Sequence, residues 1–69
     1  MKPEEVFGLN AGKVWQLLDK NRATPLTMQE IMKIGKLTRD DVMSGLGWLG
    51  REGKIEILEK DGKYAYKLI

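Results

Sequence analysis

The chain has 69 residues, with 12 Lys and Arg against 10 Asp and Glu, a net charge of +2, and neither cysteine nor histidine. This length allows one domain with a small core. The lack of Cys and His excludes disulfides and the common thiolate or imidazole metal sites, and it removes the most frequent general base of enzymes. We therefore expect no enzymatic activity, no metal or cofactor, and no small-molecule substrate.

Location and partners are also limited by composition. No apolar run approaches the roughly 18 residues that cross a membrane, and the first five residues, MKPEE, lack the apolar segment of a signal peptide. We therefore expect a cytoplasmic protein with no membrane partner. The weak positive charge permits binding to nucleic acid without requiring it.

The N-terminal residues give a mixed signal. Pro3 could begin a helical turn, but Gly8 would soon interrupt it. We therefore predict an irregular arm at residues 1–9 and a domain over residues 10–69.

The first predicted helix covers residues 10–21. Asn10 is a good N-cap residue, and the break comes before Pro25, which disfavours helix in the residue preceding it. Trp15 is predicted to lie in the core. The apolar residues follow the i, i+3, i+4, i+7 spacing of an amphipathic helix: Ala11, Val14, Trp15 and Leu18.

Two further helices are indicated by capping signals. The stretch TMQE at residues 27–30 is a T-x-x-E capping box, and Thr38 with Asp41 forms a second, weaker one. Gly35 is predicted as the C′ residue of the second helix, and Gly53 as the end of the third.

The C-terminal residues change to a period of two, which is typical of strands. Asp61-Gly62 is a strong signal for a two-residue hairpin turn, and a short strand near Leu26 could add a third strand. Counting outward from the turn predicts these pairs: Lys60–Lys63, Ile57–Tyr66, Glu56–Lys67 and Ile55–Leu68. One face of the hairpin is then apolar, and the other carries a cross-strand ion pair. The whole order predicts an α+β fold, a winged helix-turn-helix of three helices followed by a β-hairpin wing.

The stretch GLGWLG at residues 45–50 has the G-x-G-x-x-G spacing of a dinucleotide-binding loop. That loop requires a preceding strand and a following helix, whereas here a helix precedes and a hairpin follows. Three glycines in a helix cost roughly 2–3 kcal/mol relative to alanine. A close helix crossing would explain Gly45. We hypothesise that Gly47 and Gly50 let a DNA phosphate or a partner chain come near.

The stretches NAGKVW at residues 10–15 and LGWLGREGKI at residues 46–55 resemble a family of small winged helix-turn-helix proteins from bacteria and archaea. The resemblance covers residues 8–69. It implies the architecture and a capacity to form a homodimer, rather than a particular activity.

In winged-helix proteins the third helix enters the major groove and the wing contacts the DNA backbone. DNA is therefore the expected partner, and the domain could act as a small transcription regulator. Residues 38–53 have a net charge of −1, however, which opposes the phosphate field. An ordinary solvated surface is the alternative for the lysines, and a protein-interaction or dimerisation module is the alternative function. Trp48 could pack on the first helix or the wing, or lie at such an interface. The predicted DNA contacts are Lys36, Arg39, Ser44, Gly47, Arg51, Lys60 and Lys63.

Overall fold

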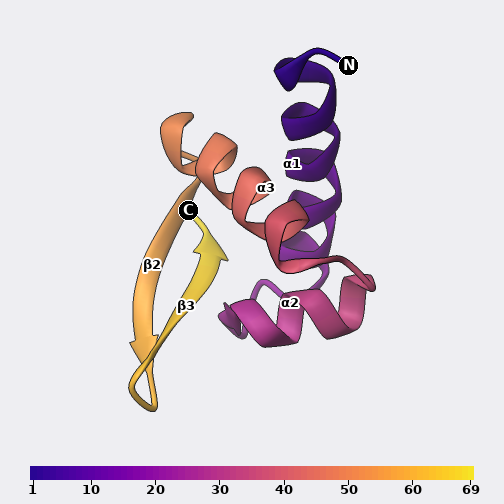
Figure 1. Ribbon diagram of the computed structural model, residues 1–69. Coiled ribbons are helices and arrows are strands. Elements are labelled where there is room, and N and C mark those ends of the chain that lie inside the picture. Colours follow the sequence, from indigo (N-terminus) through magenta and orange to yellow (C-terminus); the bar gives the residue numbers. More distant parts are fainter.

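The computed structural model describes all 69 residues, which form three helices and a three-stranded antiparallel sheet (Figure 1). The α+β winged-helix prediction is confirmed. The elements in chain order are α1 (Pro3–Lys20), β1 (Leu26–Thr27), α2 (Met28–Gly35), α3 (Arg39–Arg51), β2 (Ile55–Lys60) and β3 (Lys63–Leu68).

Helix α1 begins at Pro3, so the predictions of an irregular arm and of an N-cap at Asn10 are wrong. Proline is well suited to the first helical turn because it needs no hydrogen bond there. Glu4 and Glu5 favour the positive end of the helix dipole. Asn10 is instead buried in the middle of the helix, where its amide Nδ2 donates to Ser44 Oγ over 2.9 Å.

The predicted caps of the other two helices are present. Thr27 caps α2 and Thr38 caps α3, each in a reciprocal capping box with the side chain three residues later. Gly53 is the residue predicted to end the third helix. It follows α3 and has a φ of +71°, a left-handed conformation that glycine adopts readily.

The end of α2 differs from prediction. Lys36, not Gly35, adopts the left-handed conformation. Gly35 is the last helical residue, and a Cβ there would lie 2.6 Å from Leu17 Cδ1 of α1. A larger residue at this position would displace the flexible end of the Leu17 side chain rather than meet backbone.

Helices α1 and α3 cross with almost no space between them. A Cβ at Gly45 would lie 2.7 Å from the Asn10 carbonyl oxygen and 2.9 Å from Val14 Cγ2, which confirms the close crossing predicted for this glycine. The core packs around this crossing and continues beneath α2 and the sheet. Its largest fully buried side chains are Val14, Leu18, Ile31 and Val42.

The sheet has the strand order β1-β3-β2, with β1 as the predicted third strand. All four predicted cross-strand pairs of the hairpin are present. Asp61 and Gly62 both have positive φ, as a two-residue turn of this kind requires. Lys67 Nζ lies 3.9 Å from Glu56 Oε1. The apolar face is only partly covered, however: Tyr66 is buried, whereas Ile57 is 57% exposed.

The two tryptophans lie at the edge of the core. Trp15 is 37% exposed, so its predicted core position is wrong. Trp48 is half-buried and packs against the core, as predicted, beside Gly8 of α1. None of the helices has both the length and the apolar character that crossing a membrane requires.

The Gly45 crossing leads to a stability prediction. Gly45→Ala should lower the free energy of unfolding by about 1–3 kcal/mol, because the added methyl group meets backbone that cannot rotate away. Gly12→Ala is the matched control, since a Cβ at Gly12 meets nothing within 4 Å. It should raise stability by up to about 1 kcal/mol through helix propensity. Urea unfolding measures both, and equal effects would contradict the close-crossing account.

Candidate nucleic-acid interface

An apolar groove of about 500 Å³ separates α3 from the wing. Its lining includes Gly47 and Gly50, and a Cβ at either position would meet nothing within 4 Å. No internal contact therefore explains these two glycines. The residues that line the groove are Met43, Leu46, Gly47, Gly50, Ile55, Ile57, Tyr64 and Tyr66.

A second hollow, of about 320 Å³, lies where α2, α3 and β3 meet. It shares Met43, Tyr64 and Tyr66 with the groove, so the two are continuous. Arg39 enters from the first residue of α3, and Lys63 from the first residue of β3. No acidic side chain lines it. The complete lining is Thr27, Met28, Gln29, Arg39, Met43, Lys63, Tyr64 and Tyr66. We call this the Arg39 hollow.

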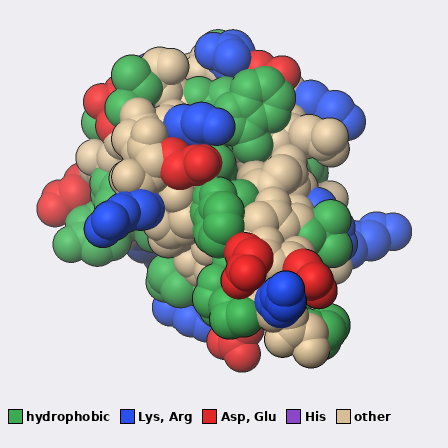
Figure 2. All heavy atoms as spheres, turned by 90° about the horizontal axis from the view of Figure 1, so that it is seen from above, with side chains coloured by type: hydrophobic (Ala, Val, Ile, Leu, Met, Phe, Trp, Pro, Cys, Tyr) green, Lys and Arg blue, Asp and Glu red, His purple; other side chains and the backbone are tan.

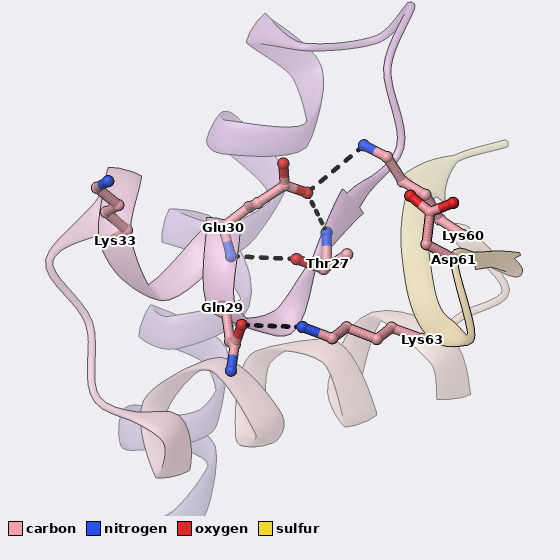
Figure 3. Close-up of a pocket in the computed structure, with 7 residues that line it drawn as sticks. All are labelled: Thr27, Gln29, Glu30, Lys33, Lys60, Asp61 and Lys63. Atoms are coloured by element: carbon pink, nitrogen blue, oxygen red, sulfur yellow. Dashed lines mark hydrogen bonds and ion pairs between the residues drawn. The ribbon is translucent and has the colours of Figure 1, made fainter.

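A third hollow, of about 390 Å³, lies between the wing tip and α2 (Figure 3). Lys60 and Lys63 both reach from the wing toward α2, whereas Lys33 points away from them. Lys60 Nζ lies 3.7 Å from Glu30 Oε1, and Lys63 Nζ donates to Gln29 Oε1 over 3.2 Å. The wing lysines are thus partly engaged by α2.

Glu30 is the acid that holds Lys60. The Thr27 backbone N–H donates to Glu30 Oε1 over 2.8 Å as part of the capping box. This hydrogen bond is the main cause of a lowered pKa at Glu30, and the positive charge of Lys60 lowers the pKa further. Both interactions stabilise the carboxylate form, so the pairing with Lys60 persists throughout the neutral pH range.

The structure does not bring all the predicted contacts together. Ser44 turns toward α1 rather than the wing: its hydroxyl accepts from Asn10 and donates to the Asp41 carbonyl oxygen over 3.0 Å. Ser44 lies about 100° around the helix from Met43, so its hydroxyl is engaged by α1 and by its own helix rather than facing the groove.

Two other predicted contacts lie away from the Arg39 hollow. Arg51 is at the opposite end of α3 from Arg39, about 18 Å along the helix axis. Lys36 is exposed in the turn between α2 and α3. Arg39, Gly47 and Lys63 therefore share the continuous surface formed by α3 and the wing, while Lys60 borders it through the third hollow.

Two of the three acids at α3 are engaged elsewhere, whereas Asp40 is exposed beside Arg39, on the same helical face as Met43 and Gly47. Asp41 accepts from the Thr38 N–H in the capping box, and Glu52 pairs with Lys54 at 3.5 Å on the side of α3 that faces α1. At the end of the molecule where α1 begins, positive and negative side chains are interspersed (Figure 2). The Arg39 hollow is lined by two cations and no acid, as is the hollow that contains Lys13 and Lys20.

Sequence reasoning missed Gln29 as a candidate contact. The sequence did contain a clue to this role. Gln29 is the second residue of the helix that Thr27 caps, and its amide can donate or accept hydrogen bonds. In the structure its side chain is exposed. Its proximity to Arg39 and Lys63 depends on the packing of α2 against both α3 and the wing, which no local pattern predicts.

Comparisons with known proteins agree with this architecture. The model of the family described as Winged helix-turn-helix domain (DUF2582) matches residues 1–68. A curated relative, Uncharacterized protein MJ1608 of Methanocaldococcus jannaschii, is 33% identical over 62 residues, which cover 90% of this chain and 89% of the relative. The solution NMR structure of protein BT2368 from Bacteroides thetaiotaomicron has a TM-score of 0.84 and 30% identity, and covers 97% of this chain and 79% of that one.

The family match confirms the resemblance found in the sequence and indicates no enzyme family. The order of the elements, the capping boxes of α2 and α3, and the three-stranded wing sheet all agree with it. The chain therefore belongs to the winged helix-turn-helix family DUF2582.

Proposed function

We propose that this winged helix-turn-helix domain binds duplex DNA mainly through phosphate contacts, with little reading of base sequence. The observation that carries this proposal is the Arg39 hollow, where the first residues of α3 and β3 place Arg39 and Lys63 beside Gln29 without an acid. Arginine, lysine and glutamine are the usual donors to phosphates and base edges. In DNA-bound helix-turn-helix proteins, the N-terminal residues of the recognition helix approach the bases.

The low sequence selectivity follows from the rest of α3. Beyond Arg39, its face toward the wing carries Met43, Gly47 and Gly50. Methionine and glycine side chains offer no strong hydrogen bond to a base edge. Their small or flexible surface would instead let the helix backbone come close to the groove walls.

A protein-docking role is the second candidate, and the exposure of the groove favours it. Met43 is 48% exposed and Tyr64 63% exposed, beside the exposed Ile57. Exposed apolar side chains gathered in one groove are typical of protein interfaces. Salt separates the two functions, because phosphate binding weakens steeply as salt rises, whereas apolar association holds or tightens in kosmotropic salts.

Arg39 and Lys63 provide the direct test of DNA binding. Arg39→Ala and Lys63→Ala should each weaken binding to random duplex DNA about tenfold, because a charge-assisted contact contributes about 1.5 kcal/mol. Each should also reduce the slope of log affinity against log salt concentration by about the amount that one phosphate contact contributes. Lys13→Ala on α1 is the control, since Lys13 borders a different hollow. Fluorescence anisotropy at several salt concentrations measures all four proteins. Unchanged affinity and slope in both variants would overturn the proposal.

Gly47 tests whether the bare α3 backbone matters. Gly47→Ala should raise the free energy of unfolding by up to about 1 kcal/mol through helix propensity, because the methyl group meets no atom within 4 Å. The same methyl group should lower DNA affinity by holding the duplex away from the helix. Gly12→Ala is the control, with a similar gain in stability and unaltered binding. If Gly47→Ala binds DNA with the affinity of the wild type, the hypothesis that the duplex comes close to the α3 backbone at Gly47 is wrong.

Glu30 should limit the contribution of Lys60. Glu30→Gln removes the charge that holds Lys60 and should strengthen DNA binding several-fold at low salt, with Glu5→Gln as a control for the loss of a distant acid. Acidification should not mimic the substitution above pH 4.5, because the pKa of Glu30 is lowered from that value. Anisotropy titrations on both variants check this. If Glu30→Gln and Glu5→Gln gain the same DNA affinity, the gain comes from the change in net charge and not from the release of Lys60.

A further inference from the structure

Strand β2 is an unpaired edge of the sheet along its whole length. The strand order β1-β3-β2 leaves one side of β2 without a neighbouring strand. All six of its residues pair in continuous register with β3, so no bulge twists this edge away. It contains no proline. Proteins usually protect such an edge with a bulge, a proline, charged side chains or a covering segment, because its backbone groups can pair with another chain. Of these protections β2 has only charged side chains, at Glu56, Glu59 and Lys60.

The middle of β2 is apolar on both faces of the sheet. Ile57 is 57% exposed on the groove side, and Leu58 is 38% exposed on the opposite side. Charged residues lie on either side of this centre, in the order Glu56, Ile57, Leu58, Glu59, Lys60. An unpaired edge with an apolar centre suits the addition of another strand.

The charge pattern of β2 is complementary to itself in one antiparallel register. When Leu58 lies opposite Leu58 of a second copy, Glu56 lies opposite Lys60 and Ile57 opposite Glu59 of that copy, and symmetry repeats both pairs. The apolar centre is therefore the Leu58 pair, on the face away from the groove. A shift that places Ile57 opposite Leu58 brings Glu56 opposite Glu59. A shift that places Ile57 opposite Ile57 brings Lys54 opposite Lys60. Like charges directly opposite one another destabilise a strand pair, so only the Leu58 register combines an apolar centre with opposite charges.

We propose that two copies of this chain associate through antiparallel pairing of their β2 edges, with Leu58 at the two-fold axis and two reciprocal Glu56–Lys60 pairs. The backbone hydrogen bonds and the apolar centre provide affinity, and the charges select the register. A two-fold contact closes on itself, so the product is a dimer rather than a fibre. Directly opposite residues in antiparallel strands point to the same face. The α3–wing surfaces of both copies therefore lie on one side of a six-stranded sheet.

Charge reversal tests this pairing with an internal control. Glu56→Lys alone places two lysines opposite each other, and Lys60→Glu alone places two glutamates opposite each other. Each variant should weaken the dimer at least about tenfold by sedimentation equilibrium. An equimolar mixture of the two variants restores both opposite-charge pairs and should form a heterodimer with affinity near that of the wild type. Amide hydrogen exchange on the wild type should show concentration-dependent protection in β2.

The mixture separates association from folding. Glu56 also pairs with Lys67, and Lys60 with Glu30, so each variant also alters one exposed intramolecular pair. Mixing cannot relieve an intramolecular defect, and circular dichroism reports the fold of each variant directly. A monomeric wild type at millimolar concentration, variants that dimerise as well as the wild type, or a mixture that stays monomeric would each overturn the proposal. None of these measurements includes DNA, so their outcome is independent of the proposed DNA binding.

Discussion

The structure depends on one close contact, the crossing of α1 over α3 at Gly45. The Asn10 carbonyl oxygen occupies space that any Cβ at Gly45 would need. The Asn10 amide donates a hydrogen bond to the hydroxyl of Ser44, the residue of α3 that precedes Gly45. Together these contacts set the rotation of α3 about its own axis. Val42, Leu46 and Leu49 consequently enter the core, and Met43, Gly47 and Gly50 are left facing the wing.

Because of this rotation, the two ends of α3 present surfaces of different chemistry to any partner. Near its start, Arg39 joins Gln29 and Lys63 in a cationic hollow. Farther along, the surface becomes an apolar groove whose lining includes two glycines. The two regions are continuous, so a single ligand that spans them would meet positive charge and then apolar surface. In the DNA-binding role that we propose, the cationic end would meet phosphates, and the rest of the surface would offer few side chains with which to read bases.

The order of elements, the capping boxes and the hairpin register could all be predicted because each depends on residues close in sequence. Errors arose where distant residues decide the outcome. Asn10 resembles an N-cap, yet it is buried against α3. Gly35 resembles a C′ residue, yet it is the last residue of the helix, and Lys36 takes the left-handed conformation after it. Trp15 has the spacing of a core residue but is 37% exposed at the edge of the core.

In the candidate site, too, features that depend on neighbouring residues could be predicted, whereas contacts between distant residues could not. The sequence by itself determined a winged helix with a glycine-rich third helix and lysines beside the wing turn, because periodicity, caps and turn residues act locally. Only the tertiary structure decided which side chains meet. It turned Ser44 inward, held Lys60 against Glu30, and brought Gln29 beside Arg39 and Lys63. These contacts join residues from different elements, and their geometry follows from how the helices pack on one another rather than from any spacing along the chain.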